Sequence, residues 1–234
     1  MIRRTFLFIS LTIFISCGLF AQSVGGNHPL VLRGEIYVDF EPIYSGHVDD
    51  EYPLDVPAAG RRALEESAMI YSAMIYGWSF NYEPGERARQ IDENIKLEPA
   101  GIVQFGDPNL NVTDIEIKNS QLNVWTDYNL SETQQRRMQT WLSGTVRNAQ
   151  AVGYSPVSID EYPGWLSLKK TAIEDAAKTA LRTMLRSSER NRPKEVSGFI
   201  SLASFPRFYI EAGRWAASAR FRVQVAGIVP FAAY

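Results

Sequence analysis

The amino-acid sequence predicts an α+β fold of two small modules, each with one helix packed on an antiparallel sheet, after an N-terminal signal peptide. Two segments, 58–76 and 168–187, carry apolar side chains at the three- and four-residue spacing of amphipathic helices. Around them, short segments alternate apolar and polar residues, as half-buried strands do. Strands and one long helix occur in the same order twice, so we place an N-terminal module at 22–142 and a C-terminal module at 143–234.

Residues 1–21 have the layout of a bacterial secretory signal. Two arginines precede an apolar run, and Ala21 stands at the expected cleavage position. The apolar run is shorter than the ~20 residues that span a bilayer. The alternative is a lipoprotein signal with lipid on Cys17, the chain's single cysteine, although Phe14 departs from the lipoprotein pattern. Both alternatives predict an exported protein, either periplasmic or associated with the outer membrane.

The N-terminal module begins with a predicted strand at 30–43 and a loop at 44–57. The helix at 58–76 follows, ends at Gly77 and leads into a strand at 78–82. Its second half is apolar nearly all round, so a single sheet covers only part of it. We therefore predict an interface between copies of this chain, with cover from the second module or the loop as the alternative. The predicted interface residues are Met69, Ile70, Ala73 and Tyr76.

Further strands are expected on both sides of the second helix. Ser131 and Gln134 have the spacing of a capping box, which predicts a short helix that ends near Leu142. The predicted strands are at 96–105, 112–118 and 122–129 in the first module, and at 146–157, 196–203, 207–211 and 215–226 in the second.

The second helix is expected to begin at Ser167, because a serine hydroxyl can accept a hydrogen bond from a backbone N–H of the first turn. Pro193 cannot continue a helix, so the end is expected at 187–191. Alanines on the buried face allow close approach to a sheet. That face is predicted to hold Ile173, Ala176, Ala177, Ala180, Leu181, Met184 and Leu185. The solvated face is predicted to hold Lys169, Lys170, Glu174, Asp175, Lys178 and Arg182.

The C-terminal module carries a family pattern. It consists of Ala-Gln-Ala-Val-Gly-Tyr-Ser-Pro-Val at 149–157, the alanine-rich helix, a hairpin and Arg-Val-Gln-Val-Ala-Gly at 222–227. Over residues 147–228 the chain resembles the FlgP/FlgT-type bacterial envelope family. The resemblance implies an exported, often lipidated protein of the outer membrane and flagellar basal region that assembles into rings or disks. It implies no catalytic, metal-binding or cofactor-binding residue.

Candidate chemistry is sparse. The formal net charge of -2 leaves no basic excess for nucleic acid. Ser167 and Lys170 spell the S-x-x-K of penicillin-recognising enzymes, but the K-T-G and S-D-N elements are missing, which favours a helix cap. His47 precedes three carboxylates at 49–51, yet a dedicated zinc site needs three or four ligands on rigid elements. A solvated acidic loop is therefore favoured, and no metal or cofactor is expected.

Two groups of side chains leave alternatives open. A basic cluster can meet anionic lipid or glycan, or can oppose the negative end of a helix dipole; it comprises Arg182, Arg186, Arg190, Arg192 and Lys194. Aromatic residues at strand spacing can line a sugar-binding groove or form core and subunit contacts; they are Trp78, Phe80, Tyr82, Trp125, Tyr128, Phe205, Phe208, Tyr209 and Trp215.

The sequence thus favours an exported, non-enzymatic structural protein of the cell envelope. A flagellar association, peripheral contact with the outer membrane, and assembly with copies of itself or with other envelope proteins are the finer expectations. The alternative is a periplasmic binding module for a glycan or protein partner that uses the aromatic strand faces.

Overall fold

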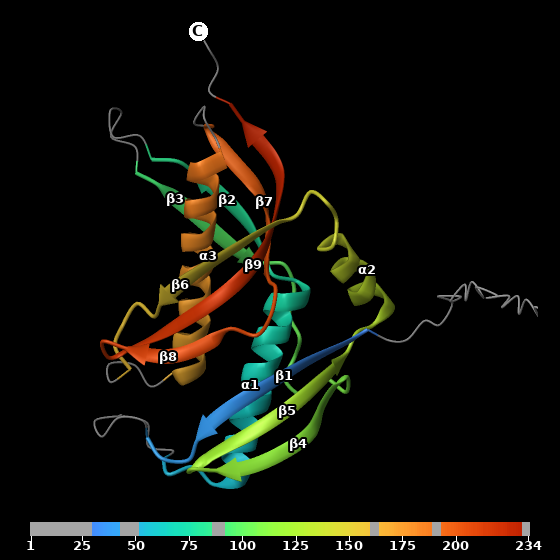
Figure 1. Ribbon diagram of the computed structural model, residues 1–234, viewed down its shortest axis with the longest axis vertical. Coiled ribbons are helices and arrows are strands. Elements are labelled where there is room, and N and C mark those ends of the chain that lie inside the picture. The colour runs from blue at the N-terminus through green and yellow to red at the C-terminus, as the bar shows by residue number, and fades with distance from the viewer. Residues whose placement is uncertain (1–29, 43–51, 86–91, 160–163, 189–192, 231–234) are drawn as a thin grey trace, which may run out of the picture.

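The computed structural model describes residues 30–42, 52–85, 92–159, 164–188 and 193–230 (Figure 1). They form two antiparallel sheets, each covered by one long helix, which confirms the predicted α+β class. The predicted signal peptide lies outside the described residues, as does Cys17.

The smaller sheet has three strands in the order β1-β5-β4. Its bounds are Val31–Asp39 for β1, Gln121–Asn129 for β5 and Leu110–Lys118 for β4. Helix α1, Val56–Ile75, begins at the N-cap Asp55 and packs on the inner face of this sheet. The hydroxyl of Tyr71 on α1 donates a 2.8 Å hydrogen bond to the carbonyl of Thr126 on β5. Burial raises the pKa of Tyr71 to about 12, so the hydroxyl stays protonated, and remains a hydrogen-bond donor, at a pH where a free tyrosine ionises.

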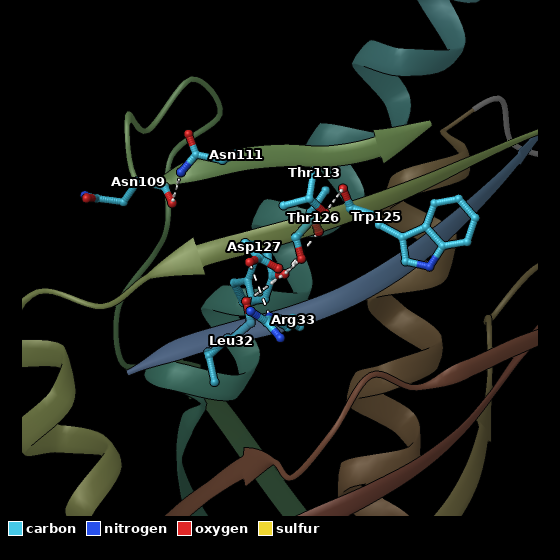
Figure 2. Close-up of polar contacts among 9 residues, drawn as sticks. Leu32, Arg33, Asn109, Asn111, Thr113, Trp125, Thr126 and Asp127 are labelled. Atoms are coloured by element: carbon cyan, nitrogen blue, oxygen red, sulfur yellow. Dashed lines mark hydrogen bonds and ion pairs between the residues drawn. The ribbon is translucent and has the colours of Figure 1, made fainter. Parts of the chain in front are cut away.

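Polar contacts tie the three strands together on the outer side (Figure 2). Arg33 on β1 forms an ion pair with Asp127 on β5, with 3.3 Å between Nε and Oδ2. The Thr113 hydroxyl donates to the Trp125 carbonyl over 3.2 Å, at the point where the register of β4 and β5 shifts. β4 is an edge strand, and a β-bulge of this kind is common there.

The larger sheet has six strands, with β8 added beside β9 to the order β3-β2-β7-β9-β6. Helix α3, Trp165–Ser188, lies across β6 and β9 (Figure 1). Gly153 on β6 lets α3 come close, because a Cβ there would lie 1.9 Å from the backbone nitrogen of Ala176. The strand bounds are Asn94–Pro99 for β3, Trp78–Glu83 for β2, Glu195–Leu202 for β7, Arg214–Val229 for β9, Arg147–Tyr154 for β6 and Arg207–Glu211 for β8.

The short helix α2, Glu132–Thr140, connects the two halves and confirms the predicted capping box. The Ser131 hydroxyl accepts from the Gln134 backbone N–H, and the Gln134 side chain accepts from the Ser131 N–H at 2.9 Å. The Gln134 amide also donates to the Tyr76 hydroxyl over 3.0 Å, so α2 covers the C-terminal end of α1.

The sheets do not divide the chain at 142/143. β2 and β3 follow α1 in sequence, but β2 pairs with β7, so both strands belong to the larger sheet. The reason lies at Gly77, whose φ of +61° turns the chain out of α1, and where a Cβ would lie 2.1 Å from the Ile200 carbonyl oxygen of β7. The predicted strand at 96–105 is also shorter, since β3 ends at Pro99.

The predicted interface on α1 is largely covered within the chain. Ile70 is 1% exposed and Ala73 5% exposed, so neither is available to a second copy. Tyr76 is half-buried under α2, and Met69, on α1 itself, is half-buried against the core. The correction has a physical cause: α1 lies between the smaller sheet and β7, and contacts both. Ile70 and Ala73 are therefore covered within the chain, which was the alternative to an interface between copies.

Candidate functional site

The two sheets meet at a hollow of about 590 Å³, which we name the junction cleft. It is bounded by β1, α1, α3 and the β8–β9 hairpin, and the junction of two packed units is a common place for a ligand site. The residues that line it are Glu35, Ile36, Tyr37, Asp39, Glu66, Ile70, Gln121, Lys169, Phe205, Pro206, Arg207, Phe208, Tyr209, Ile210 and Trp215.

A buried ion pair forms the floor of the junction cleft. Nζ of Lys169 on α3 lies 2.6 Å from Oε2 of Glu66 on α1, and the two side chains are 9% and 3% exposed. Burying two charges is tolerated when they are paired with good geometry, so this contact holds the two helices in one relative position. The prediction of a solvated Lys169 is wrong. Lys169 precedes Ile173 by four residues and therefore shares its face of α3.

Three aromatic rings enclose the ammonium group of Lys169. Its Nζ lies 4.7 Å from the ring centroid of Trp215, 5.0 Å from that of Phe208 and 5.7 Å from that of Trp165. The rings of Phe208 and Trp215 meet edge to face, with centroids 6.3 Å apart. These cation–π contacts add to the ion pair and fix the rings that face the cleft.

β8 and the segment before it supply the aromatic wall of the cleft. Phe205 packs over Gly34 of β1, where any Cβ would lie within 1.9 Å of its ring, and meets the Tyr71 ring edge to face at 5.3 Å. Tyr209 is half-buried and lines the same hollow. Four of the nine aromatic residues singled out in the sequence thus converge on one cleft: Phe205, Phe208, Tyr209 and Trp215.

The opposite wall is polar and comes from β1. Asp39 accepts a 2.7 Å hydrogen bond from the side-chain amide of Gln121 on β5. A hydrogen bond with Glu35, assisted by burial and by the negative charge of Glu35, raises the pKa of the exposed Tyr37. Arg207 adds an exposed guanidinium on the β8 side. The cleft therefore combines aromatic faces with carboxylate, amide and guanidinium groups.

A second hollow lies between α1, the N-terminal half of α3 and residues 99–105. We name it the apolar groove; its volume is about 800 Å³. Met69, Ala73 and Trp78 lie along it, and Ile102 and Phe105 stand at its rim with 67% and 52% exposure. Met69 and Ala73 are two of the four predicted interface residues on α1, whereas nothing in the sequence of the irregular segment after β3 pointed to this groove.

The other predicted site residues do not form a reactive centre in the described part of the chain. Ser167 and Lys170 are both exposed, and α3 begins at Trp165, so Ser167 lies inside the first turn and does not cap the helix. Among the described residues, no group of three or more His, Cys, Asp and Glu side chains could hold a metal ion. The candidate metal loop of His47, Asp49, Asp50 and Glu51 lies outside them.

Two residues of the predicted basic cluster, Arg182 and Arg186, form ion pairs within the chain. Glu93, which precedes β3, accepts from Arg182 at 2.6 Å and from Arg186 at 3.0 Å. Burial alone raises the pKa of Glu93, but hydrogen bonds from Arg182 and Tyr82 and the nearby positive charges lower it overall. Lys194 is exposed, and Arg190 and Arg192 lie outside the described residues.

The remaining aromatic residues have structural positions. Trp78, Phe80 and Tyr82 on β2 belong to the buried core, and Tyr128 lies against Tyr71 with ring centroids 5.4 Å apart. Trp125 is half-buried and alternates with the core-facing residues of β5. Trp78, Phe80, Tyr82 and Tyr128 thus fulfil the core role that the sequence left open for aromatic side chains.

The fold and the cleft define an α+β protein of two joined antiparallel sheets with a polar and aromatic hollow between them. A protein-family model matches residues 26–231, and the chain belongs to the family that this model describes. A protein of Treponema pallidum (strain Nichols) with the name "Uncharacterized protein" is similar: it is 26% identical over 220 residues, which cover 87% of this chain and 90% of that protein.

No solved structure matches the chain. The relative's name states no activity, so neither comparison carries a function to this chain. Neither one links the chain to FlgP/FlgT-type proteins, and that resemblance stays a prediction. In the described part of the chain, no helix has both the length and the apolar character needed to cross a membrane.

Proposed function

We propose that this chain is a non-enzymatic binding protein of the cell envelope, and that the junction cleft binds a saccharide. The observation that supports the proposal is the convergence of aromatic rings, carboxylates, an amide and a guanidinium on one hollow. A sugar ring offers an apolar C–H face to an aromatic side chain and hydroxyl groups to polar ones. A mixed lining of this kind binds such a ligand while a few polar groups set its orientation.

Each carboxylate of the cleft already has a polar partner. Glu35 forms a hydrogen bond with Tyr37, and Asp39 accepts one from the side-chain amide of Gln121. Glu66, the third carboxylate, is held by Lys169. Among the described residues that line the cleft there is no serine, threonine, cysteine or histidine, so these residues offer no nucleophile–base pair.

Isothermal titration calorimetry with chitotriose and maltotriose tests the proposal. Tyr209→Ala removes an aromatic face from the cleft, and Asp39→Asn removes a charged acceptor. We expect each variant to weaken binding of the preferred saccharide about tenfold, the loss of about 1.4 kcal/mol. Tyr154→Ala is the matched control, because Tyr154 is a half-buried tyrosine on β6 that does not line the cleft.

Two results would contradict the saccharide proposal. One is failure of both saccharides to bind at millimolar concentration. The other is binding that Tyr209→Ala and Tyr154→Ala weaken equally, since that would place the ligand outside the junction cleft.

A second candidate function, self-assembly in the envelope, is favoured by the edge strand β4. Val112, Ile115 and Ile117 are 41%, 53% and 58% exposed on this strand, and apolar edge strands are templates for pairing with another chain. The resemblance to ring-forming envelope proteins agrees with this candidate. Light scattering after size exclusion should then give a multiple of the 26.4 kDa chain mass, reduced by any cleaved signal peptide. Ile117→Lys should yield monomers; an equal mass for both proteins would exclude assembly through β4.

A further inference from the structure

β4 lies at the outer edge of the smaller sheet, on the side away from β1 (Figure 1). It pairs with β5, and among the described strands none covers its other side. A β-bulge between Val112 and Asp114 interrupts the strand near its start. Asn119 and Ser120, both with positive φ, turn the chain at its end. Residues 114–118 therefore form a regular open edge, which we name the β4 edge.

The backbone of the β4 edge has free hydrogen-bonding groups on its open side. In an antiparallel ladder the N–H and C=O of successive residues point alternately to one neighbour and to the other. The Ile115 N–H donates a 2.8 Å hydrogen bond to Oδ1 of Asp114, so it does not pair with β5. By this alternation the backbone groups of Ile117 also point to the open side. Both residues are therefore placed to join a further strand.

One face of the β4 edge is apolar. Ile115 lies opposite Val124 of β5, and Ile117 lies opposite Leu122. The two β5 residues are buried on the side that α1 covers, whereas the two isoleucines are 53% and 58% exposed. The apolar face of the smaller sheet thus continues past α1 onto β4.

The other face of the β4 edge is charged. Asp114, Glu116 and Lys118 alternate with the isoleucines, and all three are exposed. No described residue forms an ion pair with Glu116 or Lys118. The edge therefore carries two acidic groups and one basic group in a fixed order, which a partner strand has to match.

A second copy of the chain matches this order when the two β4 edges run antiparallel about a two-fold axis at Glu116. Ile115 of each copy then lies opposite Ile117 of the other, and Asp114 lies opposite Lys118. Apolar and opposite-charge cross-strand pairs both stabilise antiparallel strands. The two Glu116 side chains meet on the axis, so one like-charge pair opposes two opposite-charge pairs.

Other registers fit less well. Directly opposite residues share a face, so the register shifts only in steps that keep isoleucine on the side of isoleucine. One step sets Asp114 against Glu116 and pairs Lys118 across the bulge, where the register of β4 already shifts. The opposite step pairs Ile115 with Asn119 in the turn. The register centred on Glu116 uses the whole β4 edge.

From this self-complementarity we propose that two copies of the chain pair through their β4 edges in this register. Two three-stranded sheets then join into one continuous sheet. The Ile115 N–H donates to the Ile117 carbonyl of the second copy, and the Asp114 carboxylate turns to Lys118. A two-fold pairing occupies both edges, so assembly through β4 ends at a dimer. The proposal rests on the self-assembly candidate above and adds the partner, the symmetry and the register.

Cysteine substitution tests the register. A Cys17→Ser background leaves no other cysteine in the chain. Glu116→Cys then places two thiols opposite each other across the axis, with their Cα atoms about 4.5–5.5 Å apart, which a disulfide spans. We expect a cross-linked dimer on non-reducing electrophoresis after mild oxidation. Asp114→Cys is the matched control, because its two copies lie about 13 Å apart along the strands and should stay unlinked.

Charge exchange tests the pairing of Asp114 with Lys118. Asp114→Lys and Lys118→Asp each set like charges opposite each other at two places, so each should raise the dimer Kd about tenfold in analytical ultracentrifugation. The double variant restores both opposite-charge pairs at unchanged net charge, so its Kd should return to the wild-type value. Glu116→Gln removes the like-charge pair and should lower the Kd. Glu98→Lys, on the edge strand β3 of the larger sheet, should leave it unchanged.

The outcomes separate this register from self-assembly itself. A wild type that stays a single chain at every concentration would overturn both, and the charges of β4 would then act as a guard against pairing. A dimer that Asp114→Cys links and Glu116→Cys does not would refute the register alone. So would a double variant with a Kd no lower than that of the single variants. A mass above two chains would contradict the two-fold pairing.

Discussion

The Lys169–Glu66 pair gives the sharpest stability prediction, because its two side chains are among the most deeply buried charges in the described chain. Lys169→Met removes the cation and leaves the Glu66 carboxylate 3% exposed without its partner. Breaking a buried pair in this way costs about 3–5 kcal/mol. A domain has about 5–15 kcal/mol of stability, so the variant should lose a large share of it.

The double variant Glu66→Leu/Lys169→Met separates the pair from its surroundings. A buried ion pair replaced by apolar residues of similar size is often neutral, so the double variant should be more stable than Lys169→Met alone. Methionine also retains favourable contact with the aromatic rings that enclose Lys169. The free energies of unfolding come from urea titrations followed by circular dichroism.

The pair of Arg61 and Glu65 on α1 is the matched control. Its side chains are 70% and 27% exposed, so Arg61→Met should cost under about 0.5 kcal/mol. Equal losses for Arg61→Met and Lys169→Met would refute the claim that burial makes the Lys169 pair decisive. So would a double variant no more stable than Lys169→Met.

Three further predictions concern packing and pH. Gly153→Ala should lower the free energy of unfolding by about 1–3 kcal/mol, because the added Cβ meets the backbone of α3. Gly144 has open space around it, so Gly144→Ala should change the free energy of unfolding by less than about 0.5 kcal/mol. Equal urea midpoints for the two variants would contradict this prediction. Ala180→Leu should overpack the same interface at a cost of about 1–3 kcal/mol, and an unchanged midpoint would place Ala180 away from the sheet. The pKa of Glu93 is below its usual 4.5, so its contribution is present above pH 4.5 and is lost as the pH falls through the lower, folded-state pKa. Melting temperatures between pH 6 and pH 2.5 should therefore fall less for Glu93→Gln than for the wild type; parallel curves would show that Glu93 contributes nothing.

Periodicity alone was enough to predict both long helices and the α+β class. The three- and four-residue spacing around Ile173 and the alternation along β9 each follow from one buried face. Periodicity does not say which strand pairs with which. β2 follows α1 directly, yet its partner β7 lies more than a hundred residues later, and Gly77, with its positive φ, turns the chain out of α1 toward it.

The candidate site was predictable only in part. Alternating aromatic residues at 205–215 indicated either a binding groove or a core, and the structure shows that four of them line one cleft. The predicted solvated face of α3 included Lys169, although its spacing of four residues to Ile173 puts it on the buried face, where lysine is rarely found. A basic residue on an otherwise apolar face was the available signal for a buried partner, and that partner is Glu66 in the charged first half of α1.

Nuclear magnetic resonance of the tryptophan indole groups tests the saccharide proposal most directly. The chain has five tryptophans, and Trp215 lines the junction cleft, Trp78 lines the apolar groove, and the Trp141 indole is buried and donates to the Ile75 carbonyl at 3.3 Å. Saturating amounts of the preferred saccharide should shift the Trp215 signal and leave those of Trp78 and Trp141 in place. A shift confined to Trp78, or no shift at any indole under saturating saccharide, would contradict a saccharide site in the junction cleft.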